Sequence, residues 1–103
     1  MSKYSQKIQD VVREGDKKLL GVRLGLACIR AEIPVQVIAK WMSVTRQGVY
    51  YWFTGVTDIA SKNHPKVEQI IRVLNAARDN KELPAATLEE AMRVVKRYRS
   101  LMK

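Results

Sequence analysis

Cysteine and histidine are nearly absent, with one of each in 103 residues. A single cysteine cannot form a disulfide within the chain and fits a reducing compartment. One cysteine and one histidine are also too few to assemble a metal cluster, and there is no glycine-rich phosphate loop. We therefore expect no metal, no cofactor and no small-molecule ligand. Cys28 lies in the apolar stretch LGLACIRA, which predicts a buried packing residue and not a nucleophile.

Long apolar runs are absent as well. No stretch approaches the roughly 18 apolar residues that a membrane span requires. The N-terminal sequence MSKYSQKIQD is polar and does not resemble a signal peptide. The expected location is therefore the cytoplasm, in association with the nucleoid, or the host cytoplasm if the chain is phage-encoded, with no membrane partner.

Acidic residues are sparse: the chain has 10 Asp and Glu against 19 Lys and Arg, a net charge of +9. Between residues 17 and 64, seven Lys and Arg are opposed only by Glu32 and Asp58. Such a surplus attracts polyanions, but charge alone does not separate DNA from RNA or from an acidic protein partner. The acidic residues do not suggest a two-metal nuclease site, and His64, in a loop before Pro65, is expected at the surface or in a helix cap. An enzyme is not expected.

What the sequence does have is helical periodicity, with almost no strand signal and no internal repeat or long linker. It predicts one all-α domain over residues 1–103, a compact bundle of five to six helices. A leading helix lies within residues 1–15, a core with a central helix-turn-helix spans 16–78, and a C-terminal helix covers 87–102. The stripe of the leading helix is formed by Tyr4, Ile8, Val11 and Val12.

Typical cap residues punctuate these helices. Gly15 is expected to end the leading helix, and Asp16 could cap the next one. Pro65 is expected to open the helix that follows the polar loop of residues 54–64, with Ile59 as the anchor of that loop. Thr87 to Glu90 has the spacing of a capping box, which predicts the start of the C-terminal helix.

Residues 35–55 have the pattern of a helix-turn-helix. Two short stretches of apolar positions each follow helical spacing, and the phase breaks between them at Ser43–Val44. The second helix is expected from about Thr45 to Phe53, and no acidic residue lies between Thr45 and Gly55. The apolar or small positions of the motif, of which Trp52 and Phe53 are expected in the core, are Val35, Ile38, Ala39, Met42, Val44, Val49, Trp52 and Phe53.

The outer face of the second helix is suited to reading DNA. A helix in the major groove contacts bases near its N-terminus, which is where Arg46 and Gln47 stand. Arginine can bond two acceptors on guanine, and glutamine can pair with adenine. Tyr50 and Thr54 follow Arg46 at intervals of four, so we expect Tyr50 at a base or thymine methyl and Thr54 at a phosphate. Gly48 indicates either a close approach of the backbone to DNA or tight packing against the first helix.

The segment 35–74 resembles the lambda-repressor-like, or Cro/CI, DNA-binding domains. The resemblance implies that Ala39 lets the two helices cross closely and that Ser43 replaces the glycine usual at the turn. Serine in a left-handed conformation there would cost about 1 kcal/mol. Val35 takes the place of a phosphate-contacting glutamine, with Gln36 adjacent to it. The residues that carry the resemblance are Ala39, Met42, Gly48, Val49, Phe53 and Gly55.

The resemblance also implies backbone contacts from the loop after the reading helix. Together with the outer face of that helix, this loop completes the expected DNA-binding surface. Its candidate residues are Gln36, Thr45, Arg46, Gln47, Gly48, Tyr50, Tyr51, Thr54, Lys62 and Asn63.

The C-terminal helix is open to three interpretations. Acidic residues in its first turn and basic residues near its end fit a solvated face that complements the helix dipole. Its apolar stripe fits dimerisation, as does the resemblance, because the last helix of such domains contributes to pairing. Direct phosphate binding is the third interpretation. The candidate dimerisation residues are Leu88, Met92, Val95, Tyr98 and Met102.

These patterns favour a sequence-specific regulator of transcription, of phage or prokaryotic type, that binds double-stranded DNA as a homodimer. Repression is favoured over activation, although the chain is expected to be closer to a small Cro-type or activator-type regulator than to a full repressor. Two alternatives stay open. One is a phage-type helix-turn-helix protein that binds and inhibits a host protein, for which an acidic partner would meet the basic face. The other is an architectural or DNA-packaging protein similar to a small terminase subunit.

Overall fold

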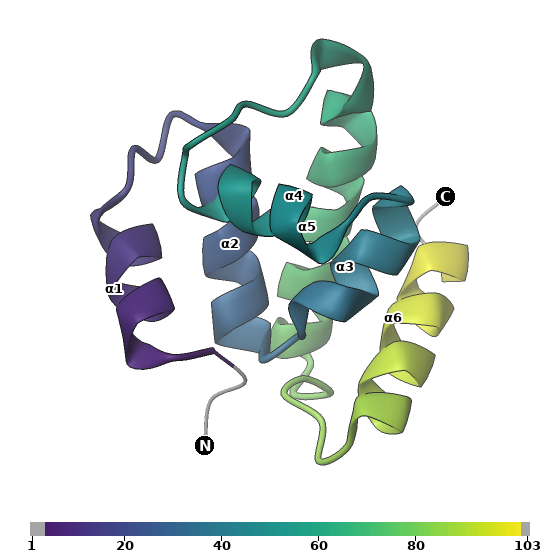
Figure 1. Cartoon of the computed structure of the whole chain (residues 1–103). Coiled ribbons are helices and arrows are strands. Elements are labelled where there is room, and N and C mark those ends of the chain that lie inside the picture. Colours follow the sequence, from purple (N-terminus) through teal and green to yellow (C-terminus); the bar gives the residue numbers. More distant parts are fainter. Residues whose placement is uncertain (1–3, 102–103) are drawn as a thin grey trace.

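The computed structural model describes residues 4–101, and this part of the chain contains six α-helices, one 3₁₀ turn and no β-strand (Figure 1). The predicted all-α fold is therefore confirmed. The helices are α1 (Gln6–Glu14), α2 (Leu20–Ala31), α3 (Val35–Met42), α4 (Arg46–Phe53), α5 (His64–Asp79) and α6 (Leu88–Leu101), with η1 (Ser61–Asn63) directly before α5. None of the helices in the described range has both the length and the apolar character to cross a membrane.

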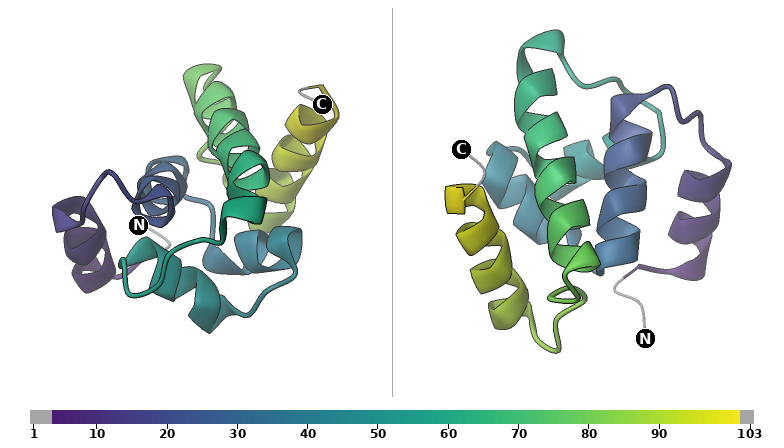
Figure 2. Two further views of the ribbon diagram at one scale, coloured as in Figure 1. Left: turned by 90° about the horizontal axis from the view of Figure 1, so that it is seen from above. Right: turned by 180° about the vertical axis from the view of Figure 1, so that it is seen from behind.

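Helices α2 and α5 form the centre of the molecule and make its most extensive helix–helix contact. Helix α1 packs on the outer side of α2, and α6 packs against α5 on the opposite side, so that α5 lies between α2 and α6 (Figure 2). Helices α3 and α4 contact one another and lie across the front of this layer in Figure 1. The largest fully buried side chains come from every helix except α6 and include Leu24, Ile38, Phe53, Ile70 and Leu74.

Most helix ends follow the predicted caps. The Thr87 hydroxyl accepts a hydrogen bond from the Glu90 amide at 3.2 Å, as the capping-box spacing predicted. Gly15 follows the last residue of α1, and Pro65 stands in the first turn of α5. Ile59 is buried and anchors the loop between α4 and α5, as expected.

Two expectations for the N-terminal region are wrong. Asp16 does not cap α2; its carboxylate accepts the Lys18 amide at 2.9 Å in a turn, and α2 begins later, at Leu20. Val11 does not belong to the buried stripe and is 39% exposed. Tyr4, Ile8 and Val12 are spaced by four and lie toward the core, whereas Val11 is rotated about 100° from Val12 around the helix.

The N-terminal segment is tied to the core by Tyr4. Its hydroxyl donates a hydrogen bond to the carbonyl of Ile33, in the connection between α2 and α3, and its ring lies 6.1 Å from that of Phe53. Cys28 is fully buried, which confirms the expected packing role. Burial raises the pKa of both the Tyr4 phenol and the Cys28 thiol well above their ordinary values, because the charged forms would lose hydration.

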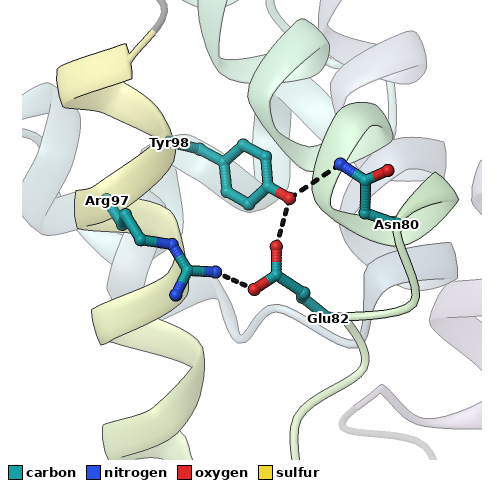
Figure 3. A network of polar contacts seen from close by, with 4 residues as sticks. All are labelled: Asn80, Glu82, Arg97 and Tyr98. Atoms are coloured by element: carbon teal, nitrogen blue, oxygen red, sulfur yellow. Dashed lines mark hydrogen bonds and ion pairs between the residues drawn. The ribbon is translucent and has the colours of Figure 1, made fainter.

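A polar network fastens α6 to the segment that follows α5 (Figure 3). The Asn80 side-chain amide donates to the Tyr98 hydroxyl at 2.9 Å, and that hydroxyl donates to the Glu82 carboxylate. Arg97 pairs with the other oxygen of the same carboxylate. The network therefore holds two successive residues of α6 to the chain next to α5.

We expect Tyr98→Phe to lower the free energy of unfolding by about 1 kcal/mol, because the variant lacks the hydroxyl and its two hydrogen bonds while the ring keeps its packing. The loss should be local: hydrogen exchange should accelerate at the amides of α6 more than at those of α2. Tyr51→Phe is the control, because the structure shows no hydrogen bond from that exposed hydroxyl within the described residues. Equal acceleration in α2 and α6 would contradict a local role.

Candidate nucleic-acid interface

The turn between α3 and α4 has the geometry that the sequence pattern predicted. Ser43 adopts a left-handed conformation, with φ 58° and ψ 46°. Its amide and that of Val44 bond back to carbonyls in the last turn of α3. Ala39 is buried where α3 meets α4. Serine therefore occupies the position that favours glycine, at a backbone cost of about 1 kcal/mol.

Helix α4 is held from beneath by three buried side chains. Val49, Trp52 and Phe53 all face the core, as expected for Trp52 and Phe53. Behind Trp52, α2 approaches so closely that only a glycine fits there: a Cβ atom at Gly21 would lie 2.4 Å from the Trp52 carbonyl oxygen. This close crossing fixes the position of α4 relative to α2.

The first turn of α4 presents Arg46 and Gln47, and both side chains are exposed. Thr45 caps the helix, and its hydroxyl accepts the Gly48 amide at 3.1 Å. In the left view of Figure 2, α4 lies at the edge of the molecule, and no other helix covers its outer side. A guanidinium and a carboxamide therefore stand next to each other on an open surface, at the helix end whose dipole is positive.

Gly48 lies on the open side of α4. A Cβ atom at this position would meet only the Thr45 hydroxyl oxygen, at 3.3 Å, and no atom of α3. Of the two interpretations of Gly48, tight packing against the first helix is therefore wrong. What remains is a place where the backbone of α4 is open to an approaching surface.

Two residues of α4 that were expected to contact DNA interact with the chain itself. Tyr50 is half-buried, and its ring packs edge-on against Phe53 with 6.3 Å between centroids. The Thr54 hydroxyl donates to the Tyr50 carbonyl at 2.8 Å, so in this conformation its only proton is not free for a phosphate oxygen. Tyr50 and Thr54 are therefore less open than Arg46 in this structure, and their expected contacts with DNA remain predictions.

The centre of the outer face is instead marked by Gln47 and Tyr51. They are four residues apart, both are exposed, and Tyr51 is 41% exposed. The buried side of α4 is centred between Val49 and Trp52, so the opposite side falls on these two residues, while Tyr50 is displaced sideways. The sequence placed Tyr51 among the candidates, but with less weight than Tyr50.

The remaining candidates lie outside α4. Gln36 is half-buried and lines a groove together with Arg46. Lys62 is exposed in η1 and Asn63 is half-buried; both lie at the far end of the loop that leaves α4, next to α5. Sequence reasoning missed Lys40, the exposed cation in the last turn of α3.

It also missed Val56, which is 67% exposed just after α4. An apolar residue this exposed is visible only once the path of the loop is known. The order of apolar and polar residues in this loop does not show that Val56 is exposed.

The expected dimer face on α6 is corrected in part. Val95 and Tyr98 are buried within the single chain, because α6 packs on α5, so they are not free to meet a second copy. Leu88 is half-buried and Met92 is 40% exposed. Met102 lies outside the described residues.

Four of the nine exposed residues of α6 are basic, and one of these four contacts α3. The guanidinium of Arg99 stacks over the Trp41 ring, 4.5 Å from its centroid. Helix α6 therefore packs on α5 and reaches α3 through the Arg99–Trp41 contact. Comparisons of the chain with protein-family models, with curated proteins and with solved structures gave no match.

Proposed function

We propose that this chain is a sequence-specific regulator that binds double-stranded DNA through a lambda-repressor-like helix-turn-helix, with α4 in the major groove. The observation that carries the proposal is the exposed pair Arg46 and Gln47 in the first turn of a helix that lies at the edge of the molecule. A guanidinium and a carboxamide are the groups that read guanine and adenine most specifically.

Three further features support this assignment. No acidic residue lies between Thr45 and Gly55, so no carboxylate of α4 would repel the phosphates. Gly48 leaves the backbone of α4 open, since a Cβ atom there would meet only the Thr45 hydroxyl oxygen. The net charge of +9 favours rapid association with a polyanion. Pairing through the apolar stripe of α6 is not part of the proposal, since the chain itself covers Val95 and Tyr98.

The proposal is tested by selecting preferred duplexes from a random pool and titrating salt on a selected and a random duplex. We expect affinities that differ by at least ~10³-fold, the lower range of specific protein–DNA complexes. A ratio near one would overturn sequence-specific regulation in favour of an architectural role. The selected sequences also report half-site spacing, and a two-part site one helical turn apart would indicate paired binding.

Gln47→Ala and Arg46→Ala should each lose about 1–3 kcal/mol of binding free energy on the selected duplex and relax the preference at one base position. The matched controls are Gln6→Ala and Arg30→Ala, which remove the same groups from exposed positions on α1 and α2. Fluorescence anisotropy with the selected and random duplexes measures both effects. If Gln47→Ala weakens every duplex equally, Gln47 contacts only the DNA backbone.

A further inference from the structure

A groove runs between α3 and α6 and reaches the first turn of α4. It consists of two hollows of about 570 and 320 Å³ that share Val37, Lys40 and Met92. One hollow extends toward the start of α4, and the other extends along α6 past Trp41. The interpretation of α6 as a simple solvated face does not account for a hollow of this size.

The floor of the groove is apolar. Val37 from α3 and Met92 from α6 face it from opposite walls, and Met92 is 40% exposed at the point where the two hollows meet. Ala39, Val44 and Leu88 extend the apolar floor of the larger hollow. Methionine side chains adapt their shape to a partner, and they are frequent at surfaces that accept apolar side chains.

The rim of the groove is basic. None of the described residues that line the two hollows is acidic, and the acidic pair of α6, Glu89 and Glu90, lies outside the lining. The cations that line the hollows are Lys40, Arg46, Arg93, Lys96 and Arg99. An occupant that carries negative charge around an apolar ridge would therefore match both the rim and the floor.

We propose that the α3–α6 groove binds an acidic amphipathic segment of another protein, with an apolar side chain seated against Met92 and carboxylates next to the basic rim. A helix laid in a groove uses this combination of apolar anchors and flanking charges. This site borders the DNA-reading surface proposed above, with Gln36, Thr45 and Arg46 common to both, but its centre lies between Val37 and Met92.

Two other occupants fit less well. A second copy of this chain would bring its own basic rim against this one, and such like-charge contact opposes pairing. A DNA backbone would satisfy the cations but would leave the apolar floor without a matching surface, since phosphates and sugars bond polar side chains. An acidic amphipathic segment satisfies both parts of the groove.

The probe for the test is a synthetic peptide of about 14 residues, or four helical turns, with leucine at helical spacing and glutamate at the other positions. Two control peptides accompany it: one with the same composition in an order that lacks helical spacing, and one with lysine in place of glutamate. A fluorescein label reports binding to the full chain by anisotropy. We expect saturable binding of the acidic amphipathic peptide and at least about tenfold weaker binding of either control.

Met92→Arg separates the groove from general attraction between charges. The substitution adds a cation but removes the apolar seat, so binding of the acidic peptide should weaken about tenfold or more. Val11→Arg makes the same change at a similarly exposed apolar position on α1 and should leave the affinity unchanged or slightly stronger. If Met92→Arg binds the peptide as well as Val11→Arg does, the proposal is overturned.

The rim is tested with the double variant Arg93→Gln/Lys96→Gln, for which we expect about threefold to tenfold weaker peptide binding at low salt. The control is Arg23→Gln/Arg30→Gln on α2, which removes the same charge on the other side of α5. A loss of affinity for duplex DNA as large as the loss for peptide would assign the groove to the nucleic-acid interface and overturn the proposal. Failure of the peptide to bind the wild-type chain would overturn it as well.

The fluorescence of Trp41 can report on the site directly, since this residue lines the smaller hollow beneath Arg99. In a Trp52→Phe background it is the one remaining tryptophan. An occupant that displaces the Arg99 guanidinium should change the emission of Trp41 with the same midpoint as the anisotropy. An unchanged emission at saturating peptide would place the peptide elsewhere on the chain and contradict the proposal.

Discussion

Replacing Gly21 by alanine is expected to lower the free energy of unfolding by about 3 kcal/mol, the upper range for forced overpacking of a core. The added Cβ would lie 2.4 Å from the carbonyl oxygen of Trp52 and 2.8 Å from its carbonyl carbon. These are backbone atoms, so no side-chain rotation can relieve the contact. The only relief is a shift of α4 away from α2, which would open the core around Phe53. Urea unfolding of the wild-type and Gly21→Ala chains measures the difference in the free energy of unfolding.

The shift of α4 should also be visible in DNA binding. If Arg46 and Gln47 read bases, moving their helix against the rest of the chain should weaken binding to the selected duplex more than to a random one. For the unfolding measurement, Gly48→Ala on α4 is the control, because its Cβ would meet only the Thr45 hydroxyl oxygen.

In that control we expect only a small change in stability, because the roughly 0.5–1 kcal/mol by which alanine is favoured over glycine within a helix is opposed by the 3.3 Å contact with the capping Thr45 hydroxyl. Binding to the selected duplex should nevertheless weaken, because the new methyl group stands on the open side of α4. A Gly21→Ala chain as stable as the wild type would contradict the close crossing of α2 and α4.

The helices were predictable because their signals are local. Spacing by three and four, together with Gly15, Pro65 and Thr87, is readable without knowledge of tertiary contacts. The start of α2 was not predictable in this way. Asp16 resembles a cap, but its carboxylate completes a turn with Lys18 before the helix begins, and the choice between these two short-range bonds depends on how the following segment packs.

The candidate site was predicted in its centre and missed at its edges. The turn at Ser43 and the exposed positions of Arg46 and Gln47 follow from the break in helical phase. The roles of Tyr50 and Tyr51 were harder to separate, because they differ by one step of about 100° on a short helix. Only the packing of Phe53 shows which of them turns inward.

The α3–α6 groove could not be predicted from the sequence at all. It depends on how two helices more than 40 residues apart in the chain are placed, and no periodicity encodes that placement. The sequence showed Arg93, Lys96 and Arg99 as charges on one helix, with a solvated face as one interpretation. Their position opposite Lys40 and around Met92 is a property of the tertiary structure.

The second large effect is expected in alkaline solution, where the chain should lose about 4 kcal/mol of stability between pH 8 and pH 11. The ordinary pKa values of a thiol and a phenol are 9.0 and 10.0, and burial raises the pKa of both Cys28 and Tyr4 in the folded chain. The folded chain therefore keeps two protons that the unfolded chain releases. Below pH 9 neither group lowers stability. Above its ordinary pKa, each group lowers the free energy of unfolding by about 1.4 kcal/mol per pH unit until the pH reaches its folded pKa.

The thiol and the phenol can be separated by substitution. Cys28→Ala should remove the decline that begins at pH 9, so that its loss between pH 8 and pH 10 is smaller than that of the wild type by about 1.4 kcal/mol. Tyr4→Phe should keep the decline that begins at pH 9 and lose the part that begins at pH 10.

Neutralisation of lysines in the same range relieves repulsion in a chain of net charge +9, and comparison with the two variants cancels this opposing effect. Urea unfolding at fixed salt, in the presence of a reductant, measures all three curves. Equal losses for the wild type and Cys28→Ala would mean that the thiol ionises as readily in the folded chain as in the unfolded one, which a fully buried position does not permit.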